Sequence, residues 1–266
     1  MSDAIDSFLV AKIAEGRPDG GRALRVLDLP AGDGELSRKL DAAGLSVTGA
    51  DLFPNASGFR PERVVRADMN RRLPFEDGAF DVLVCQEGIE HLENVAAFLR
   101  ECRRVLREGG ELWLTTPNVM DLSSRLAFFW LGIKSFHGDL PNEEATLWGA
   151  SGESYYHGHA FTLPFFQIRY LLRIEDFDEI ELHGLKPSGT SRALYWALRP
   201  LAGVCVRRAL RRRNARDRAD GRPAASGELL REIERLALSP ELLCNGKIGI
   251  RAVRREGSFR PAEQGG

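Results

Sequence analysis

The chain has 266 residues, of which 43% are hydrophobic, enough apolar surface to close a sizeable core, and this composition argues against a disordered polypeptide. Its 37 Lys and Arg residues almost balance its 38 Asp and Glu residues, so the formal net charge is −1. A nearly neutral chain excludes a general attraction to nucleic acid or membranes. Any such affinity must come from a local cluster of charges.

The cysteines and the first residues favour a reducing compartment. Four cysteines are scattered without CxxC spacing, which argues against a disulfide framework and a zinc ribbon: Cys85, Cys102, Cys205 and Cys244. The first residues are acidic where a signal peptide needs basic ones, and no apolar run approaches the roughly 18 to 20 residues of a membrane span. These features predict a cytoplasmic protein.

From residue 24 to residue 118, short apolar runs alternate with amphipathic stretches, a pattern typical of βαβ units on a mostly parallel sheet. Buried strands are expected at residues 24–29, 46–51, 63–68, 80–85 and 111–116. Helices are expected at residues 35–43 and 92–106. Because the carboxyl ends of parallel strands share one edge, the polar residues that close these strands should lie together there.

The regular alternation stops after residue 118. Residues 119–161 form an insertion rich in aromatic residues and glycine, and so long an insertion is usually functional. A helix is expected after residue 162, and the last two strands at 178–182 and 247–253, the latter alternating as an edge or antiparallel strand does. We predict a single domain with these parts: core motifs at 24–118, a basic and apolar insertion at 192–225, a last helix and strand at 226–254, a domain end at 257, and a disordered tail at 258–266.

Two glycines, Gly32 and Gly34, stand at the turn from the first strand to the first helix, where a missing Cβ lets backbone approach a ligand beside a helix N-terminus. An ordinary tight turn explains a glycine pair equally well. Asp51, however, ends the next strand 19 residues after Gly32, where a carboxylate can accept both hydroxyls of a ribose. Ser37 occupies the third glycine position of a dinucleotide motif, so a mononucleoside fits better than a dinucleotide.

These residues resemble the motifs of class I S-adenosylmethionine-dependent methyltransferases. The resemblance runs in order through residues 24–118 and rests on the glycine loop at 26–34, the ribose-binding acid Asp51, the adenine-side loop at 68–75, the fourth strand and its turn at 80–92, and the stretch at 104–118. Pro30 and Ala31 replace the more usual Gly-Cys, which narrows the freedom of the loop. The resemblance implies a doubly wound, mostly parallel seven-stranded α/β sheet with helices on both faces.

The resemblance also implies S-adenosylmethionine as the cofactor and a set of residues that contact it. Gly32 and Gly34 would lie beside the methionine moiety, and Asp28 would orient that loop or the cofactor's ammonium group. Asp68 would accept a hydrogen bond from the adenine amino group while Met69 packs on the ring. The alternative is that Asp51 is an ordinary turn carboxylate and that Asp68 is a helix N-cap or a turn residue. The expected contacts are Asp28, Pro30, Ala31, Gly32, Gly34, Asp51, Leu52, Asp68, Met69 and Gln86.

Methyl transfer from a sulfonium needs positioning and, for an oxygen or nitrogen acceptor, a base. His91, with Glu90 beside it, follows the fourth strand near the expected methyl group, and histidine ionises near neutral pH. A packing or capping role explains His91 equally well. Glu87, Glu90 and His91 resemble an acidic and histidine cluster with a metal role in ubiquinone-pathway O-methyltransferases. Because only three ligands lie close in sequence, we expect no metal.

Four residues of the insertion are expected to contact the methyl acceptor, because aromatic and histidine side chains suit the faces of sugars and phenols: Tyr155, Tyr156, His157 and His159. A hydrophobic cluster under a long loop is the alternative. Similarity to bacterial enzymes of cell-surface pathways implies O-methylation of a small molecule, a saccharide or a lipid-linked acceptor. The alternatives are a tRNA or protein methyltransferase and a cofactor-binding module without transfer activity.

The segment from Arg199 to Arg222 carries nine arginines against two aspartates, a local balance of +7. Tyr195, Trp196 and several leucines and valines precede most of these arginines. This order is typical of a helix in a membrane interface, where aromatic side chains enter the headgroup layer and arginines meet anionic lipid. We therefore predict peripheral membrane attachment through residues 193–218, with nucleic-acid contact or a solvated linker as alternatives.

Overall fold

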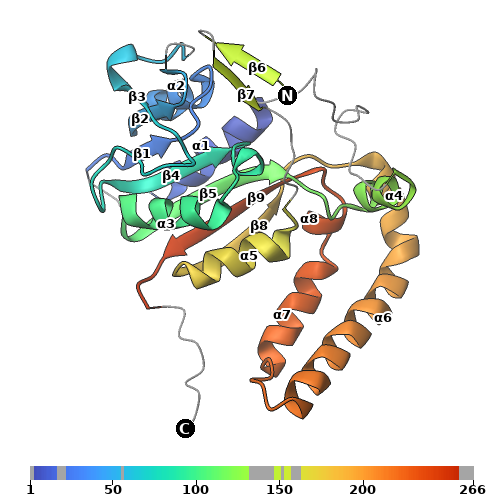
Figure 1. The fold of residues 1–266 in the computed structure, drawn as a ribbon. Helices are drawn as coiled ribbons and strands as arrows, with labels where there is room; N and C mark the ends of the chain where they lie inside the picture. The colour runs from blue at the N-terminus through green and yellow to red at the C-terminus, as the bar shows by residue number, and fades with distance from the viewer. Residues whose placement is uncertain are drawn as a thin grey trace. The chain divides into compact units, whose positions relative to one another are not determined.

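The computed structural model describes residues 3–16, 22–54, 57–131, 147–150, 153–156 and 163–257 (Figure 1). The chain divides into two compact units. The first unit consists of residues 1–117, 141–181 and 249–259, and the second of residues 118–140, 182–248 and 260–266. The predicted domain boundary at residue 257 stays a prediction, and the predicted tail at 258–266 lies outside the described residues.

A seven-stranded mixed sheet has the strand order β3-β2-β1-β4-β5-β9-β8. Its strands are β1 (Arg25–Asp28), β2 (Ser46–Asp51), β3 (Val64–Arg66), β4 (Phe80–Gln86), β5 (Leu106–Pro117), β8 (Phe177–Gly184) and β9 (Lys247–Arg254). β1 to β5 pair in parallel, and β9 runs antiparallel to β5 (Figure 1). The doubly wound α/β fold predicted from the sequence is confirmed, including the different direction of its last strand.

Helices cover both faces of this sheet, which explains its continuous apolar strands. In β4 every residue from Phe80 to Cys85 is buried, as expected of a parallel strand covered on both sides. The covering helices of the first unit are α1 (Asp3–Glu15), α2 (Glu35–Ala42), α3 (Val95–Val105) and α5 (Phe165–Ile174). On one face of the sheet, α1 packs on α2. On the opposite face, α3 packs on β5 and on α5 (Figure 1).

The first unit also contains a two-stranded antiparallel hairpin, β6 (Leu147–Ala150) and β7 (Glu153–Tyr156). It lies in the predicted insertion at residues 119–161, for which the sequence indicated no strands. Short two-residue connections join antiparallel strands readily, and only residues 151–152 separate these two.

In its described part, the second unit contains the end of β8, the start of β9 and four helices: α4 (Leu122–Leu131), α6 (Gly189–Ala219), α7 (Gly227–Ala237) and α8 (Pro240–Leu243). α6 is 31 residues long and continues through Pro200. The hydroxyls of Ser188 and Ser226 cap the starts of α6 and α7 by accepting backbone N–H groups. Within the described ranges, no helix is long and apolar enough to cross a membrane.

Candidate functional site

Three neighbouring strands of the first unit, β1, β2 and β4, end at the same edge of the sheet. Their last residues are Asp28, Asp51 and Gln86. The sequence predicted that these polar strand ends would lie together, and the parallel pairing confirms it. Six of the predicted site residues are half-buried at or beside this edge: Pro30, Leu52, Asp68, Met69, Gln86 and His91.

The loop after β1 is held between its two neighbouring strands by backbone hydrogen bonds. Leu29 N donates to Val84 O at 2.9 Å, and Ala31 N donates to Ala50 O at 2.8 Å. Gly34 has φ +76°, and a Cβ there would lie 2.7 Å from Phe59 N. Only glycine therefore fits at residue 34.

Gly32 also has a positive φ, +52°, but a Cβ at that position would meet nothing within 4 Å. The positive φ favours glycine there. The open space beside Gly32 leaves its backbone accessible to a ligand. The two predicted glycines thus differ, since one is required by close packing and the other by conformation alone.

Asp51 fastens this glycine loop. Its Oδ2 accepts a hydrogen bond from Gly32 N at 2.9 Å, and its Oδ1 accepts one from Phe53 N at 2.9 Å. The side chain shapes the turn, as the alternative explanation for Asp51 expected. Because each carboxylate oxygen can accept more than one hydrogen bond, the same group can also receive ribose hydroxyls. The two explanations are therefore compatible.

Asp28 lies in the interior, where 1% of the residue is exposed. Ser37 Oγ donates to Asp28 Oδ2 at 2.6 Å, which fastens the end of β1 to α2. Burial raises the pKa of Asp28 to about 7, with smaller contributions in the same direction from the charges of Asp6 and Asp51 and an opposing one from the hydrogen bond of Ser37. Of the two roles implied for Asp28, these contacts favour orienting the loop.

Gln86 has a partner that sequence reasoning missed. Its Nε2 donates to Asp6 Oδ1 of α1 at 2.9 Å, and the other oxygen of Asp6 accepts from Lys39 Nζ of α2 at 2.9 Å. Asp6 is fully buried, on the same helix as the buried Ile5 and Leu9. An acidic residue among the apolar positions of a short amphipathic stretch is the signal that could have revealed it.

Pro30 and Met69 both lie against Gly88, in the turn after β4. A Cβ on Gly88 would stand 2.7 Å from Pro30 Cδ and 3.2 Å from Met69 Cε. The glycine loop, the adenine-side loop and the turn before His91 therefore meet at one point. Asp68 Oδ1 accepts a hydrogen bond from Asn70 N at 2.9 Å, a contact that is expected if Asp68 is a turn residue.

His91 ends a short 3₁₀ helix, η3 (Ile89–His91), and its backbone N donates to Gly88 O at 3.1 Å. Glu90 is buried and accepts a hydrogen bond from Thr116 Oγ1 of β5 at 3.1 Å. Glu87 has the unusual φ of +51° and accepts a hydrogen bond from Thr115 Oγ1 at 3.2 Å. Both glutamates thus attach the turn that carries His91 to the end of β5.

The alternative metal site at Glu87, Glu90 and His91 receives no support from this geometry. Among the residues that the structure describes, no group of three or more His, Cys, Asp or Glu side chains is arranged to hold a metal ion. Tyr155 and Tyr156, predicted to contact the acceptor, lie on β7. His157 and His159 lie outside the described residues, so the acceptor site stays a prediction.

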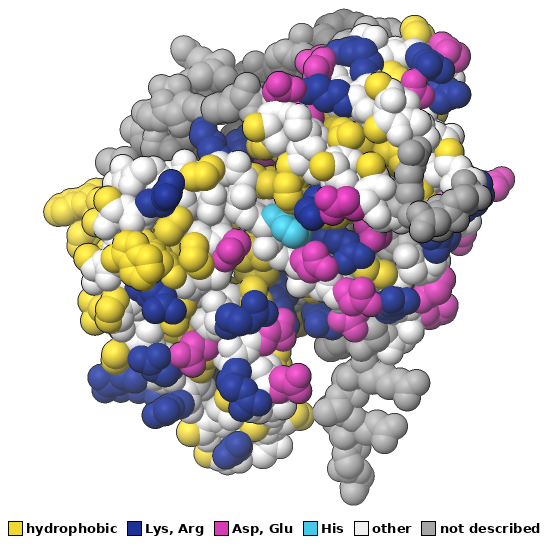
Figure 2. Space-filling view, turned by 180° about the vertical axis from the view of Figure 1, so that it is seen from behind, with side chains coloured by type: hydrophobic (Ala, Val, Ile, Leu, Met, Phe, Trp, Pro, Cys, Tyr) yellow, Lys and Arg dark blue, Asp and Glu magenta, His cyan; other side chains and the backbone are white. Residues whose placement is uncertain are grey.

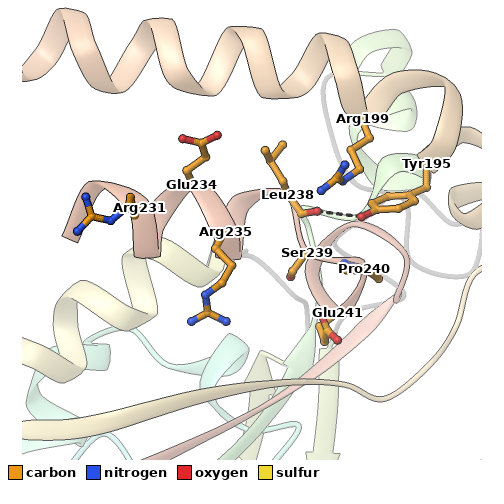
Figure 3. Close-up of a pocket in the computed structure, with 9 residues that line it drawn as sticks. All are labelled: Tyr195, Arg199, Arg231, Glu234, Arg235, Leu238, Ser239, Pro240 and Glu241. Carbon is orange, nitrogen blue, oxygen red and sulfur yellow. Dashed lines mark hydrogen bonds between the residues drawn. The ribbon is translucent and has the colours of Figure 1, made fainter. Parts of the chain in front are cut away.

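A cavity of about 550 Å³ lies in the second unit, between α6, α7 and the turn into α8 (Figure 3). Tyr195 Oη donates to Leu238 O at 3.1 Å on one side of it. The guanidinium groups of Arg199, Arg231 and Arg235 point in different directions (Figure 3). They therefore form no common site for an anion, although the charge of the lining is mostly positive.

The sheet order and the glycine loop define a class I methyltransferase fold. Residues 27–114 match the family model described as a methyltransferase domain. This segment is therefore similar to the S-adenosylmethionine-dependent methyltransferases, in which S-adenosylmethionine is the methyl donor. The resemblance inferred from the sequence is thereby confirmed.

Curated relatives match about a third of the chain. A ubiquinone biosynthesis O-methyltransferase of Xanthomonas oryzae is 38% identical over 104 residues, which cover 35% of this chain and 43% of the relative. One of Pseudomonas aeruginosa is 33% identical over 106 residues, covering 35% and 44%. The chain spans less than half the length of these relatives.

Solved structures resemble nearly the whole chain, at low sequence identity. A SAM-dependent methyltransferase from Archaeoglobus fulgidus is 16% identical, covers 94% of each chain and has a TM-score of 0.53. The YcgJ protein of Bacillus subtilis is 17% identical, covers 97% of this chain and 100% of its own, and has a TM-score of 0.53. These likenesses show the fold.

Proposed function

We propose that this protein transfers the methyl group of S-adenosylmethionine to an oxygen atom of a small molecule, a saccharide or a lipid-linked acceptor. The observation that carries the proposal is the hydrogen bond from Gly32 N to Asp51, which joins the glycine loop to the ribose-binding acid at the edge where Gln86 also ends its strand. The names of the curated relatives, O-methyltransferases of ubiquinone biosynthesis, support an oxygen acceptor.

The described residues fit this cofactor in shape and in charge. The open space beside Gly32 lets a ligand approach the backbone of the loop. The charges of Asp6, Asp33 and Asp51 all act on the carboxyl group of Asp28, so several acidic groups gather around the end of β1. Such a surplus of acidic groups suits a ligand that carries ammonium and sulfonium charges.

Each residue of the edge has a role in this proposal. Asp51 accepts hydrogen bonds from the ribose hydroxyls while it keeps the loop in place, and Met69 packs on the adenine. The bound cofactor supplies an activated methyl group for an in-line displacement. His91 would accept the proton of the acceptor hydroxyl while the acceptor oxygen bonds to the methyl carbon and the bond between that carbon and the sulfur breaks, which leaves S-adenosylhomocysteine. Glu90, bonded to Thr116, holds the turn of His91 and is a positioning residue.

The test has two stages. Calorimetry with S-adenosylmethionine and S-adenosylhomocysteine should detect binding of both, because Asp51 and the glycine loop contact groups that both forms share. A turnover screen on extracts fractionated into lipids, saccharides, tRNA and protein then identifies the acceptor class. Binding without turnover on any fraction would favour a cofactor-binding module, and methylation of tRNA or protein alone would replace the proposed acceptor.

We also propose that the protein attaches peripherally to anionic membrane through residues 193–218, which would bring it to a lipid-linked acceptor. In the structure these residues belong to one helix, α6, rather than to a solvated linker. Trp196 and Leu201 are largely exposed on it. An exposed apolar stretch followed by arginines suits a helix lying in the membrane interface.

A further inference from the structure

We propose that the aromatic end of α4 and the outer face of α6 form one docking surface for an anionic lipid bilayer. This inference rests on the membrane attachment proposed above and extends it to a second helix. It concerns only the second unit of the chain, to which both helices belong. The surface is defined here as residues 126–130 of α4 together with the exposed face of α6 that consists of Ala197, Leu201, Val204, Arg208 and Arg211.

The end of α4 is unusually apolar for an exposed helix. Leu126, Phe128, Phe129 and Trp130 are 47%, 61%, 76% and 74% exposed. The rings of Phe129 and Trp130 stand edge to face, with centroids 5.2 Å apart. Single exposed apolar residues are common, but a contiguous group of large ones marks an interaction site.

Hydrogen bonds and a small core hold α4 to α6. Ser191 Oγ of α6 donates to Asp121 Oδ1 at 2.8 Å and accepts from Ser123 N at 2.9 Å, at the start of α4. Leu122 and Tyr195 are packed in the same buried cluster. The two helices are therefore joined at their beginnings, and their exposed apolar side chains belong to the same unit of the chain.

The exposed face of α6 changes from apolar to basic along its length. Ala197, Leu201, Val204, Arg208 and Arg211 follow one another at steps of four and three residues, the spacing of a single helix face, and all are exposed. The buried residues of this part of α6, Tyr195 and Gly203, lie on the opposite side of the helix. The apolar half thus continues into arginines on one unbroken face.

The charges of this face are available to a partner. The ion pairs of α6 among the described residues are Arg207 with Glu234 and Arg213 with Asp217, and none involves Arg208 or Arg211. Figure 2 shows hydrophobic side chains gathered on the left flank of the molecule, with a group of Lys and Arg side chains below them. This arrangement presents apolar and cationic surface side by side.

A bilayer surface matches every part of this face, whereas RNA matches the arginines and the aromatic rings but not the aliphatic side chains. Phosphates would pair with the arginines and bases could stack on Phe129 and Trp130, but Leu126, Leu201 and Val204 would remain in water. In an anionic bilayer, the aromatic side chains enter the boundary between headgroups and acyl chains, and the arginines remain among the lipid phosphates. The combination therefore favours lipid.

Vesicle flotation of the full chain tests this inference. We expect binding to phosphatidylglycerol-containing vesicles, little binding to pure phosphatidylcholine, and a loss of binding from about 0.1 M to about 1 M salt, where the Debye length falls to about 3 Å. Phe129→Ser with Trp130→Ser should lower the vesicle partition coefficient by about tenfold or more. Arg208→Gln with Arg211→Gln should lower it on anionic vesicles. Tyr170→Ser, which removes an exposed aromatic of α5, is the matched control and should change nothing.

Affinity for S-adenosylhomocysteine, measured on the same variants, distinguishes this inference from the proposed enzymatic function. Variants that keep that affinity and lose vesicle binding support the docking surface, whether or not methyl transfer is found. Quenching of tryptophan fluorescence by lipids brominated on their acyl chains provides a second test, and it should weaken in Trp130→Phe. Equal binding to neutral and anionic vesicles, unchanged binding of the Phe129 and Trp130 variant, or binding of single-stranded RNA in place of vesicles would overturn the inference.

Discussion

The side-chain amide of Gln86, at the end of β4, donates a hydrogen bond to Asp6 of α1 across a gap of 80 residues in the chain. Asp6 is buried, and its second oxygen bonds to Lys39 of α2. A single carboxylate thus connects a strand end of the proposed cofactor site to the two helices packed on that side of the sheet. Such a contact orients Gln86 before any ligand arrives.

Replacing Asp6 by Ala should lower cofactor affinity several-fold and destabilise the protein by about 1 to 3 kcal/mol, because the half-buried amide of Gln86 and the ammonium group of Lys39 lose a buried acceptor. Asp6→Asn keeps an oxygen that can accept from Gln86 and should retain most of the affinity. Asp3→Asn is the control, since Asp3 binds the same Lys39 from an exposed position. Calorimetric titration and urea unfolding measure both quantities. Unchanged affinity in Asp6→Ala would show that Gln86 needs no such orientation.

Replacing Asp51 by Ala should lower the affinity for S-adenosylhomocysteine about ten- to a hundredfold, which corresponds to roughly 1.5 to 3 kcal/mol for a charge-assisted contact. The change also removes the acceptor of Gly32 N, so the folded state must be checked by thermal unfolding. Asp41→Asn, which alters a surface carboxylate paired with Arg60, controls for the change of charge. An Asp51→Ala protein that binds the ligand as tightly as the wild type would refute the ribose assignment.

The raised pKa of Asp28 makes stability depend on pH in a definite direction. Burial moves this pKa from 3.8 to about 7 in the folded state, so Asp28 binds a proton there while the unfolded chain has released it. The stabilising contribution is therefore complete below pH of about 4 and is lost as the pH rises toward about 7, with a slope of at most about 1.4 kcal/mol per pH unit.

Asp28→Asn should remove this part of the pH dependence. Urea unfolding at pH of about 5 and about 7 measures it as the difference between wild type and variant, which we expect to reach about 1 to 3 kcal/mol. The amide oxygen of Asn can still accept the hydrogen bond from Ser37, so the fold has no other cause to change. Parallel pH profiles for the two proteins would contradict a protonated Asp28 in the folded state.

If His91 is the base, His91→Ala should lower turnover by about 10² to 10⁴ while cofactor affinity stays constant. Glu90→Gln should lower it less, because an amide can still accept the hydrogen bond from Thr116. The assay is run with and without a chelator. Restoration of chelated enzyme by a divalent ion would favour the metal alternative, and loss of folded protein in His91→Ala would favour a packing role.

Much of the first unit followed from the sequence. The turn with Gly32 and Gly34, the carboxylate of Asp51 and the strands over residues 24–118 were predicted close to their observed positions, except that β5 begins at Leu106, five residues before the predicted strand at 111–116. These features are readable because they depend on local patterns: a parallel strand buried on both faces is apolar throughout, and a turn with positive φ selects glycine. The alternation of apolar and polar residues in β9 is also a local pattern, and it indicated an edge or antiparallel strand.

The tertiary structure decided which polar side chains are buried and what they touch. The burial of Asp28 and Glu90, and the contact between Gln86 and Asp6, bring together residues from different elements, so no local pattern reports them. α1 and its contribution to the site were not predicted, nor was the β6–β7 hairpin.

The second unit shows the same division. The order of the residues alone showed that the segment 193–218 is apolar at first and basic afterwards. That α6 continues through Pro200, and that α4 is bonded to it at Ser191, depends on packing between segments distant in the chain. A helix becomes stable mainly through the partners that bury one of its faces, and those partners are determined only when the chain is folded.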